Sequence, residues 1–150
     1  MTRLRLLTLV VVGLAIIVAW QKVEAKSKRM HVSAEVVQQT FTGDPTDPQL
    51  GDRRITNVRL RDQDGTNVGT GAGFCTVVSV PPEGTLEACL LTAVFAEGQI
   101  IFGGVAPLAE VGAVAQFGIL GGTDDFRKAR GDAILVVTPS GVIDVSFDLD

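Results

Sequence analysis

The chain has 150 residues, of which 46% are hydrophobic, and it carries a formal net charge of −4. This length fits about one domain, and the apolar content is enough to bury a core. The acidic balance argues against nucleic acid as a partner, because phosphate backbones are bound by clustered Lys and Arg.

The N-terminal segment has the layout of a secretory signal peptide. Arg3 and Arg5 precede an uninterrupted run of apolar or small residues from Leu6 to Trp20. This run is short for a membrane helix, which needs about 20 residues, whereas a basic start followed by a short apolar stretch is typical of export signals. We predict that residues 1–25 are a signal peptide and that residues 26–150 form a single secreted domain. An uncleaved signal anchor, the one expected membrane contact, is the alternative.

Short β-rich segments alternate with turn signals after residue 25. The predicted strands are 31–41, 55–60, 73–80, 85–95, 99–102, 111–120, 133–138 and 142–148. Asp64-Gly65 and Pro139-Ser140-Gly141 are typical hairpin turns between them. Strands at this spacing, without a long segment of helical period, indicate an antiparallel barrel or sandwich. Because closure removes free sheet edges, we predict an all-β closed antiparallel barrel of about eight strands.

The two cysteines are placed to form a disulfide. Cys75 and Cys89 lie almost symmetrically about the turn signal Pro81-Pro82-Glu83-Gly84. A hairpin centred near residue 82 puts the two cysteines on facing strands, and exported compartments are oxidising. We predict a cross-strand disulfide, worth roughly 3 kcal/mol for a loop of about 15 residues if chain entropy dominates.

The common signatures of catalysis and metal binding are missing. The sequence has one histidine, two cysteines and no tyrosine, and it lacks the Gly-x-Ser-x-Gly element of many serine hydrolases. One histidine beside two paired cysteines is too small a ligand set for zinc. Asp62-x-Asp64-Gly65 places its glycine too early for an EF-hand calcium loop and predicts a hairpin turn. We therefore predict neither a metal nor an organic cofactor.

Residues 56–61 offer polar candidates for a site. Two sets alternate along this segment, with Thr56, Val58 and Leu60 on one face and Asn57, Arg59 and Arg61 on the other. Period-two alternation by itself turns the apolar face inward and the polar face to water.

Two glycine-rich runs carry a family resemblance. Residues 121–131 read Gly-Gly-Thr, two residues, Phe-Arg, one residue, Ala-Arg-Gly, and this pattern resembles the closing motif of the dirigent proteins. Residues 68–75, Val-Gly-Thr-Gly-Ala-Gly-Phe-Cys, resemble a segment of the allene oxide cyclases. The resemblance implies an antiparallel barrel whose interior cavity binds an apolar small molecule.

The resemblance to the allene oxide cyclases also implies site residues. In that family, the asparagine of a Thr-Asn pair points into the barrel and holds a water on the substrate oxygen, while a first-strand glutamate steers charge. Carried over, this implies catalytic roles for Asn57 and Glu35, and it makes Arg59, on the face of Asn57, a ligand-binding residue. It also offers a reactive Cys75 thiol as the alternative to a disulfide with Cys89. The later tyrosine of the cyclases has no counterpart here.

The resemblance implies a secreted dirigent-like or cyclase-like barrel that binds a small apolar unsaturated molecule and directs its cyclisation or coupling. Such a protein would be an isomerase without metal or organic cofactor. The alternative is a non-catalytic extracytoplasmic carrier for a small hydrophobic ligand, because a fold does not determine a function. The sequence leaves open whether the chain is an enzyme and whether it forms a homo-oligomer.

Overall fold

The computed structural model describes residues 28–80, 84–108 and 110–150. Eight antiparallel strands are each paired with the next, and the pairing of β1 with β8 closes the sheet into a barrel. This confirms the predicted fold class. The predicted signal peptide, residues 1–25, lies outside the described residues. The strands are β1 (Lys28–Phe41), β2 (Arg53–Arg61), β3 (Asn67–Ser79), β4 (Leu86–Phe95), β5 (Gly98–Pro107), β6 (Val114–Gly122), β7 (Gly131–Val137) and β8 (Ile143–Leu149).

The eight predicted strands correspond to the eight observed ones, and β3 and β5 differ most in extent. β3 begins at Asn67, six residues earlier than predicted, because the glycine-rich run before residue 73 pairs with both β2 and β4. β5 continues to Pro107 because its second half pairs with the start of β4. Glycine in a strand weakens the local strand signal, and pairing on both sides overrides it.

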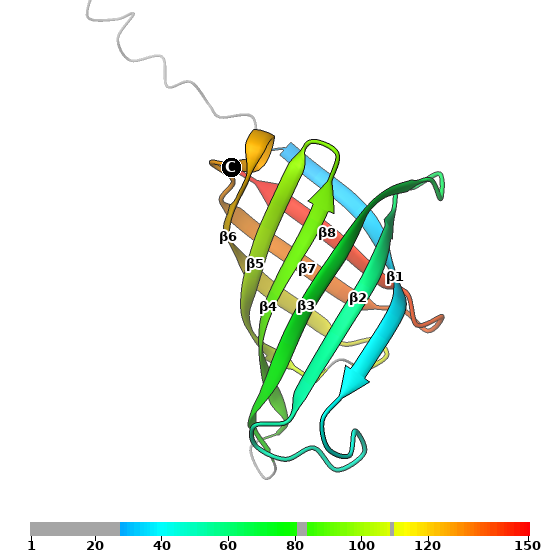
Figure 1. Ribbon diagram of the computed structural model, residues 1–150, viewed down its shortest axis with the longest axis vertical. Helices are drawn as coiled ribbons and strands as arrows, with labels where there is room; N and C mark the ends of the chain where they lie inside the picture. The colour runs from blue at the N-terminus through cyan, green and yellow to red at the C-terminus, as the bar shows by residue number, and fades with distance from the viewer. Residues whose placement is uncertain (1–27, 81–83, 109) are drawn as a thin grey trace, which may run out of the picture.

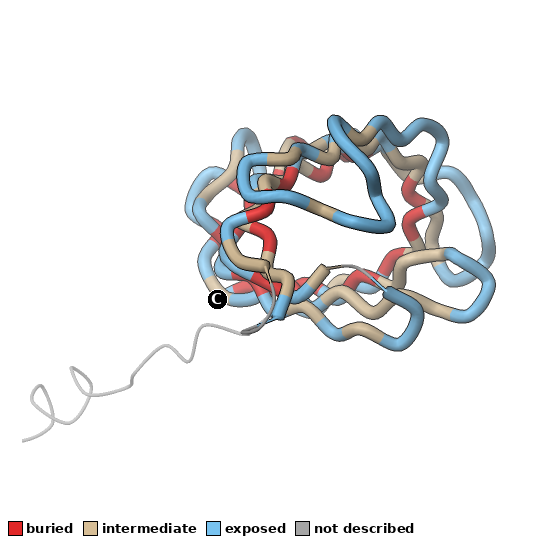
Figure 2. Tube along the Cα trace, turned by 90° about the horizontal axis from the view of Figure 1, so that it is seen from below, coloured by how far each residue is buried: buried red, intermediate tan, exposed pale blue. Residues whose placement is uncertain are grey.

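The barrel has two ends with different connections (Figure 1). The lower end, as we call it, holds the ends of β1, β3, β5 and β7; the upper end holds the short 3-10 turn η1 (Asp124–Phe126) and the C-terminus. Viewed from below, the Cα trace forms a ring with the buried residues along its wall (Figure 2). None of the helices in the described residues is long and apolar enough to cross a membrane.

The upper half of the interior is filled by aromatic side chains. Five phenylalanines form a chain of ring contacts with centroids 5.3 to 6.3 Å apart, which we call the phenylalanine plug: Phe126, Phe95, Phe147, Phe102 and Phe117. Two of these contacts are edge-to-face, an arrangement that aromatic pairs favour. The plug occupies the upper half, and a cavity lies beneath it.

Phe147 tests the importance of the plug, because its side chain is almost fully buried and contacts two other rings. We expect Phe147→Ala to lower the free energy of unfolding by about 3–5 kcal/mol, since it removes a large buried side chain and leaves a void. Urea denaturation followed by circular dichroism measures this change. The exposed Ile55 on the outer face is the control, and Ile55→Ala should cost less than about 1 kcal/mol. Equal losses would contradict a core centred on the plug.

Candidate functional site

A cavity of about 130 Å³ occupies the lower half of the barrel, below the phenylalanine plug. Its deep part is lined by Leu60, Phe102, Phe117 and Phe147, and it is partly enclosed. Small residues such as Ala106 and Ala115 line its lower part. An eight-stranded barrel is just wide enough to be filled by side chains or to hold one small ligand. Small residues below the plug therefore create the space.

One wall of the cavity consists of glycines on β3. Gly71 and Gly73 face inward, opposite Val58 and Thr56 of β2. A Cβ atom at Gly73 would lie 2.3 Å from Cδ2 of Leu91, and one at Gly71 would lie 2.7 Å from Cγ2 of Val58. A Cβ atom at either position would force the neighbouring side chain to shift, and one at Gly73 would also lie 2.7 Å from the backbone oxygen of Leu90. Because the glycines have no side chains, the side chains of Val58 and Leu91 from the neighbouring strands can pack against this wall.

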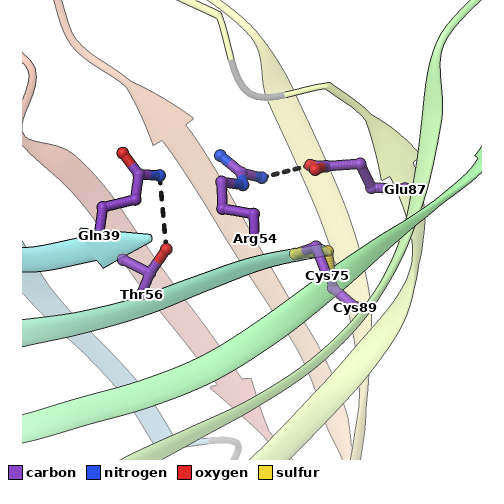
Figure 3. Close-up of a disulfide and its surroundings, with 6 residues drawn as sticks. All are labelled: Gln39, Arg54, Thr56, Cys75, Glu87 and Cys89. Atoms are coloured by element: carbon purple, nitrogen blue, oxygen red, sulfur yellow. Dashed lines mark hydrogen bonds and ion pairs between the residues drawn. A yellow bond between two sulfur atoms is a disulfide. The ribbon is translucent and has the colours of Figure 1, made fainter. Parts of the chain in front are cut away.

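The lower part of the cavity contains a buried ion pair. Arg54 of β2 reaches over β3 to Glu87 of β4, and Nη2 of Arg54 donates a hydrogen bond to Oε2 of Glu87 (Figure 3). The Glu87 side chain is 1% exposed and that of Arg54 is 17% exposed. Both residues line the cavity, and they are the two charged residues in its lining. Charges are rarely buried unless they are paired, which explains why the two side chains meet.

Burial raises the pKa of the Glu87 carboxyl above its ordinary value, and the charge and hydrogen bond of Arg54 offset this effect only in part. Desolvation dominates because the carboxylate loses its water and gains one strong partner. Nε of Arg54 and Oε1 of Glu87 are also buried, and neither has a hydrogen-bond partner among the described residues. A carboxyl with a raised pKa in a cavity can exchange a proton with a bound molecule.

The predicted disulfide is confirmed and lies beside the ion pair. Cys75 and Cys89 occupy directly paired positions of β3 and β4 and are joined by a bond of 2.06 Å. Both line the cavity (Figure 3). Neither sulfur is therefore free to act as the reactive thiol that was the alternative.

Gln39 and Thr56 add two further polar side chains to the cavity wall. Nε2 of Gln39 donates a long hydrogen bond of 3.4 Å to Oγ1 of Thr56. Gln39 faces inward because the ladder between β1 and β2 shifts register between Val36 and Gln38. A β-bulge of this kind reverses which residues of a strand face inward.

One cluster of possible metal ligands lies here as well. Sγ of Cys75, Sγ of Cys89 and a carboxylate oxygen of Glu87 are within 4.8 Å of one another. Metals bind the thiolate form of cysteine, and the disulfide leaves no thiolate here. In the oxidised protein, this cluster does not have the chemistry of a metal site.

The structure places Asn57, Arg59 and Glu35 outside the cavity. Asn57 is exposed on the outer face of β2, because its neighbours Thr56 and Val58 face inward. Glu35 forms exposed ion pairs with Arg59 at 3.6 Å and Arg61 at 3.1 Å. The expectation that Asn57 points into the barrel and that Arg59 shares an interior face with it is therefore wrong. Glu35, expected to be catalytic, is not part of the cavity lining either. A shift of one residue moves a strand position to the opposite face.

Period-two alternation predicts the orientation of β2 correctly, and the same rule could have identified Arg54 and Glu87, which were not among the predicted site residues. Arg54 lies an even number of residues from Thr56 and Val58 and so faces inward with them, and Glu87 faces inward with Cys89. Once the disulfide is expected to face the interior, the phase of β4 places Glu87 beside it. Gln39 had no such signal, because a bulge in β1 precedes it.

Fold and cavity together define a small closed β-barrel with an interior cavity. Residues 29–149 match the family described as the allene oxide cyclase barrel-like domain. The chain belongs to this family, which confirms the resemblance to the allene oxide cyclases. None of the curated proteins compared with the chain matches it.

Several solved structures share the fold. A pyocyanin demethylase superposes with a TM-score of 0.73 and 22% identity, over 82% of this chain and 100% of that one. AbnU, an exo-specific intermolecular Diels-Alderase, gives a TM-score of 0.66 and 19% identity, over 81% and 98%. The Diels-Alderase AbmU from Streptomyces koyangensis gives 0.69 and 18%, over 81% and 63%. At these identities the likeness establishes the fold alone.

The raised pKa of Glu87 has a measurable effect on stability. The folded protein holds the Glu87 proton more tightly than the unfolded chain does, so this stabilisation is present at acid pH and is lost as pH rises through the folded-state pKa. We expect the free energy of unfolding of the wild type, relative to Glu87→Gln, to fall as pH rises through that range. Urea denaturation at a series of pH values measures it. A difference that is constant or grows with pH would contradict a desolvated carboxyl.

Proposed function

We propose that this protein binds a small, apolar, unsaturated molecule inside the barrel and directs its cyclisation. The observation that carries the proposal is a partly enclosed apolar cavity with one buried ion pair in its wall. Ligand sites typically combine an apolar lining with a few placed polar groups. The membership in the allene oxide cyclase barrel-like family supports the same function.

The size of the cavity limits the ligand. An apolar cavity of about 150 Å³ in another protein holds benzene, so a cavity of about 130 Å³ encloses roughly one ring. The apolar part of the ligand packs against Phe102, Phe117 and Phe147 in the deep part, and its polar group lies towards Arg54 and Glu87. A larger ligand extends beyond the cavity at its open side.

Ring closure suits such a site chemically. An intramolecular cyclisation forms a new σ bond at the expense of a π bond, so that the product is an isomer of the substrate and no oxidant is consumed. The cavity contributes by holding the substrate in a folded conformation away from water. The Arg54 guanidinium stabilises negative charge that develops on a substrate oxygen, and Glu87 exchanges a proton with it. These two residues take the roles that the family resemblance implied for Asn57, Arg59 and Glu35.

The names of two structural neighbours support cyclisation. Both are named as Diels-Alderases, which form rings from unsaturated molecules. The pyocyanin demethylase is named for a different reaction, so the barrel fold is compatible with more than one chemistry. Since the identities are low, these names bear on the class of ligand and not on its identity.

We further infer that the protein acts outside the cytoplasm. The basic and apolar N-terminal segment and the Cys75–Cys89 disulfide support this, because structural disulfides persist in oxidising compartments.

Turnover tests the proposed function. The purified protein is incubated with an organic extract of its host's culture, and liquid chromatography with mass spectrometry follows pairs of compounds of equal mass, one consumed and one formed. We expect Arg54→Gln to slow such an isomerisation on the order of 100-fold, because it removes a charged donor at the developing charge. Asn57→Ala and Glu35→Gln, on the outer face, should turn over at the wild-type rate. If a compound binds and no isomer forms, the protein is a carrier and not an enzyme.

Export is tested by the intact mass of the protein purified from its own host. We expect a mass that corresponds to a chain beginning at Lys26, and a gain of two hydrogen atoms on reduction because the Cys75–Cys89 bond opens. A chain that retains residues 1–25 would favour the signal anchor. Two free thiols before reduction would contradict an oxidising location.

A further inference from the structure

The Arg54–Glu87 pair leaves two complementary atoms unused. Nη2 of Arg54 and Oε2 of Glu87 bond to each other. Nε of Arg54 and Oε1 of Glu87 remain buried without a partner among the described residues. The first atom can only donate a hydrogen bond, and an ionised carboxylate oxygen can only accept one. Buried polar atoms are nearly always paired in folded proteins, with protein, water or ligand, so the donor and the acceptor left over in this ion pair suit a partner that both accepts and donates.

The charges of the cavity determine which ligands it accepts. Arg54 and Glu87 are the two charged residues of the lining, and together they are neutral. An anionic or a cationic ligand would leave one charge uncompensated in a largely apolar space, which is strongly unfavourable. A neutral ligand keeps the ion pair intact.

We propose, building on the ligand-binding function above, that the ligand is a neutral hydroxyl compound: an alcohol, a phenol or an enol. Its oxygen accepts the hydrogen bond of Arg54 Nε–H, and its hydrogen is donated to Oε1 of Glu87. A hydroxyl group is the smallest group that both donates and accepts. An ether or a ketone only accepts, so it would leave the Glu87 oxygen unpaired.

The geometry of the cavity orients this ligand. The ion pair lies near the lower end of the barrel, while Leu60, Phe102 and Phe117 line the deep part. The hydroxyl group therefore lies towards the lower end, and the apolar body lies against the phenylalanine plug. In a cyclisation, this arrangement places the oxygen where Glu87 can take its proton and Arg54 can stabilise the resulting charge.

Three one-ring probes test the inference on the wild-type protein: phenol donates and accepts, anisole only accepts, and toluene does neither. All three have about the size that a cavity near 130 Å³ encloses. Isothermal titration calorimetry measures their affinities. We expect phenol to bind at least about tenfold more tightly than toluene and anisole, because hydrogen bonds to charged groups are the stronger ones.

The outcomes separate this inference from the proposed function. Toluene binding as tightly as phenol overturns the hydroxyl anchor and leaves an apolar ligand site, since phenol gives up more hydration on entering a cavity without partners. Benzoate is added to the titrations as an anionic probe with one ring, and binding of benzoate more tightly than phenol overturns the inference that the ligand is neutral. If none of the probes binds at all, the ligand-binding function fails, and this inference fails with it.

A matched pair of variants locates the anchor. In Glu87→Gln, the amide oxygen takes the place of Oε2 towards Arg54, and its NH₂ group replaces the acceptor Oε1 by a donor. We expect the preference for phenol over toluene to fall below about threefold, with the affinity for toluene unchanged. Glu35→Gln makes the same substitution in an ion pair on the outer face and should keep the full preference. A full preference in Glu87→Gln would overturn the assignment.

Discussion

Pairing of β1 with β8 is the constraint on which the rest of the structure depends. The ladder runs from Lys28 opposite Leu149 to Ala34 opposite Ile143 and turns an open sheet into a barrel. Closure gives every strand an inner and an outer face and leaves no free edge. The interior then has a fixed width, and the size of the inward side chains decides whether it is solid or hollow. Large rings fill the upper half, while glycine and alanine leave the lower half open.

The sequence predicts the fold well because the strands and turns are local signals. Eight β-rich segments and the symmetric cysteines predict the barrel and the disulfide, and both are present. The site was harder to predict, because it depends on which face each residue occupies. At Asn57, alternation and family resemblance disagree, and alternation is right because Thr56 and Val58 already occupy the inner face. The strand pairing of the closed barrel determines which residues of β2 face inward, whereas a short motif carried over from relatives does not.

The ion pair could not be recognised from motif spacing, because its two members are 33 positions apart and meet only across β3. Buried ion pairs add little to stability compared with apolar residues of similar size. The presence of this pair in an otherwise apolar cavity is therefore consistent with the proposed role in ligand recognition. The disulfide beside Arg54 and Glu87 joins β3 and β4, which form the surrounding wall. The ion pair therefore lies on a rigid part of the barrel.

The glycine wall has a consequence for how this binding site can change during evolution. Because Gly71 and Gly73 contribute no side chains, the contour of the wall is set by Val58 and Leu91, which belong to neighbouring strands. Exchanges among aliphatic residues at those two positions alter the space for a ligand and leave both the hydrogen-bonding groups and the backbone pairing in place. Selectivity for ligand shape can therefore drift separately from chemical recognition. A single scaffold could in this way serve a series of related compounds.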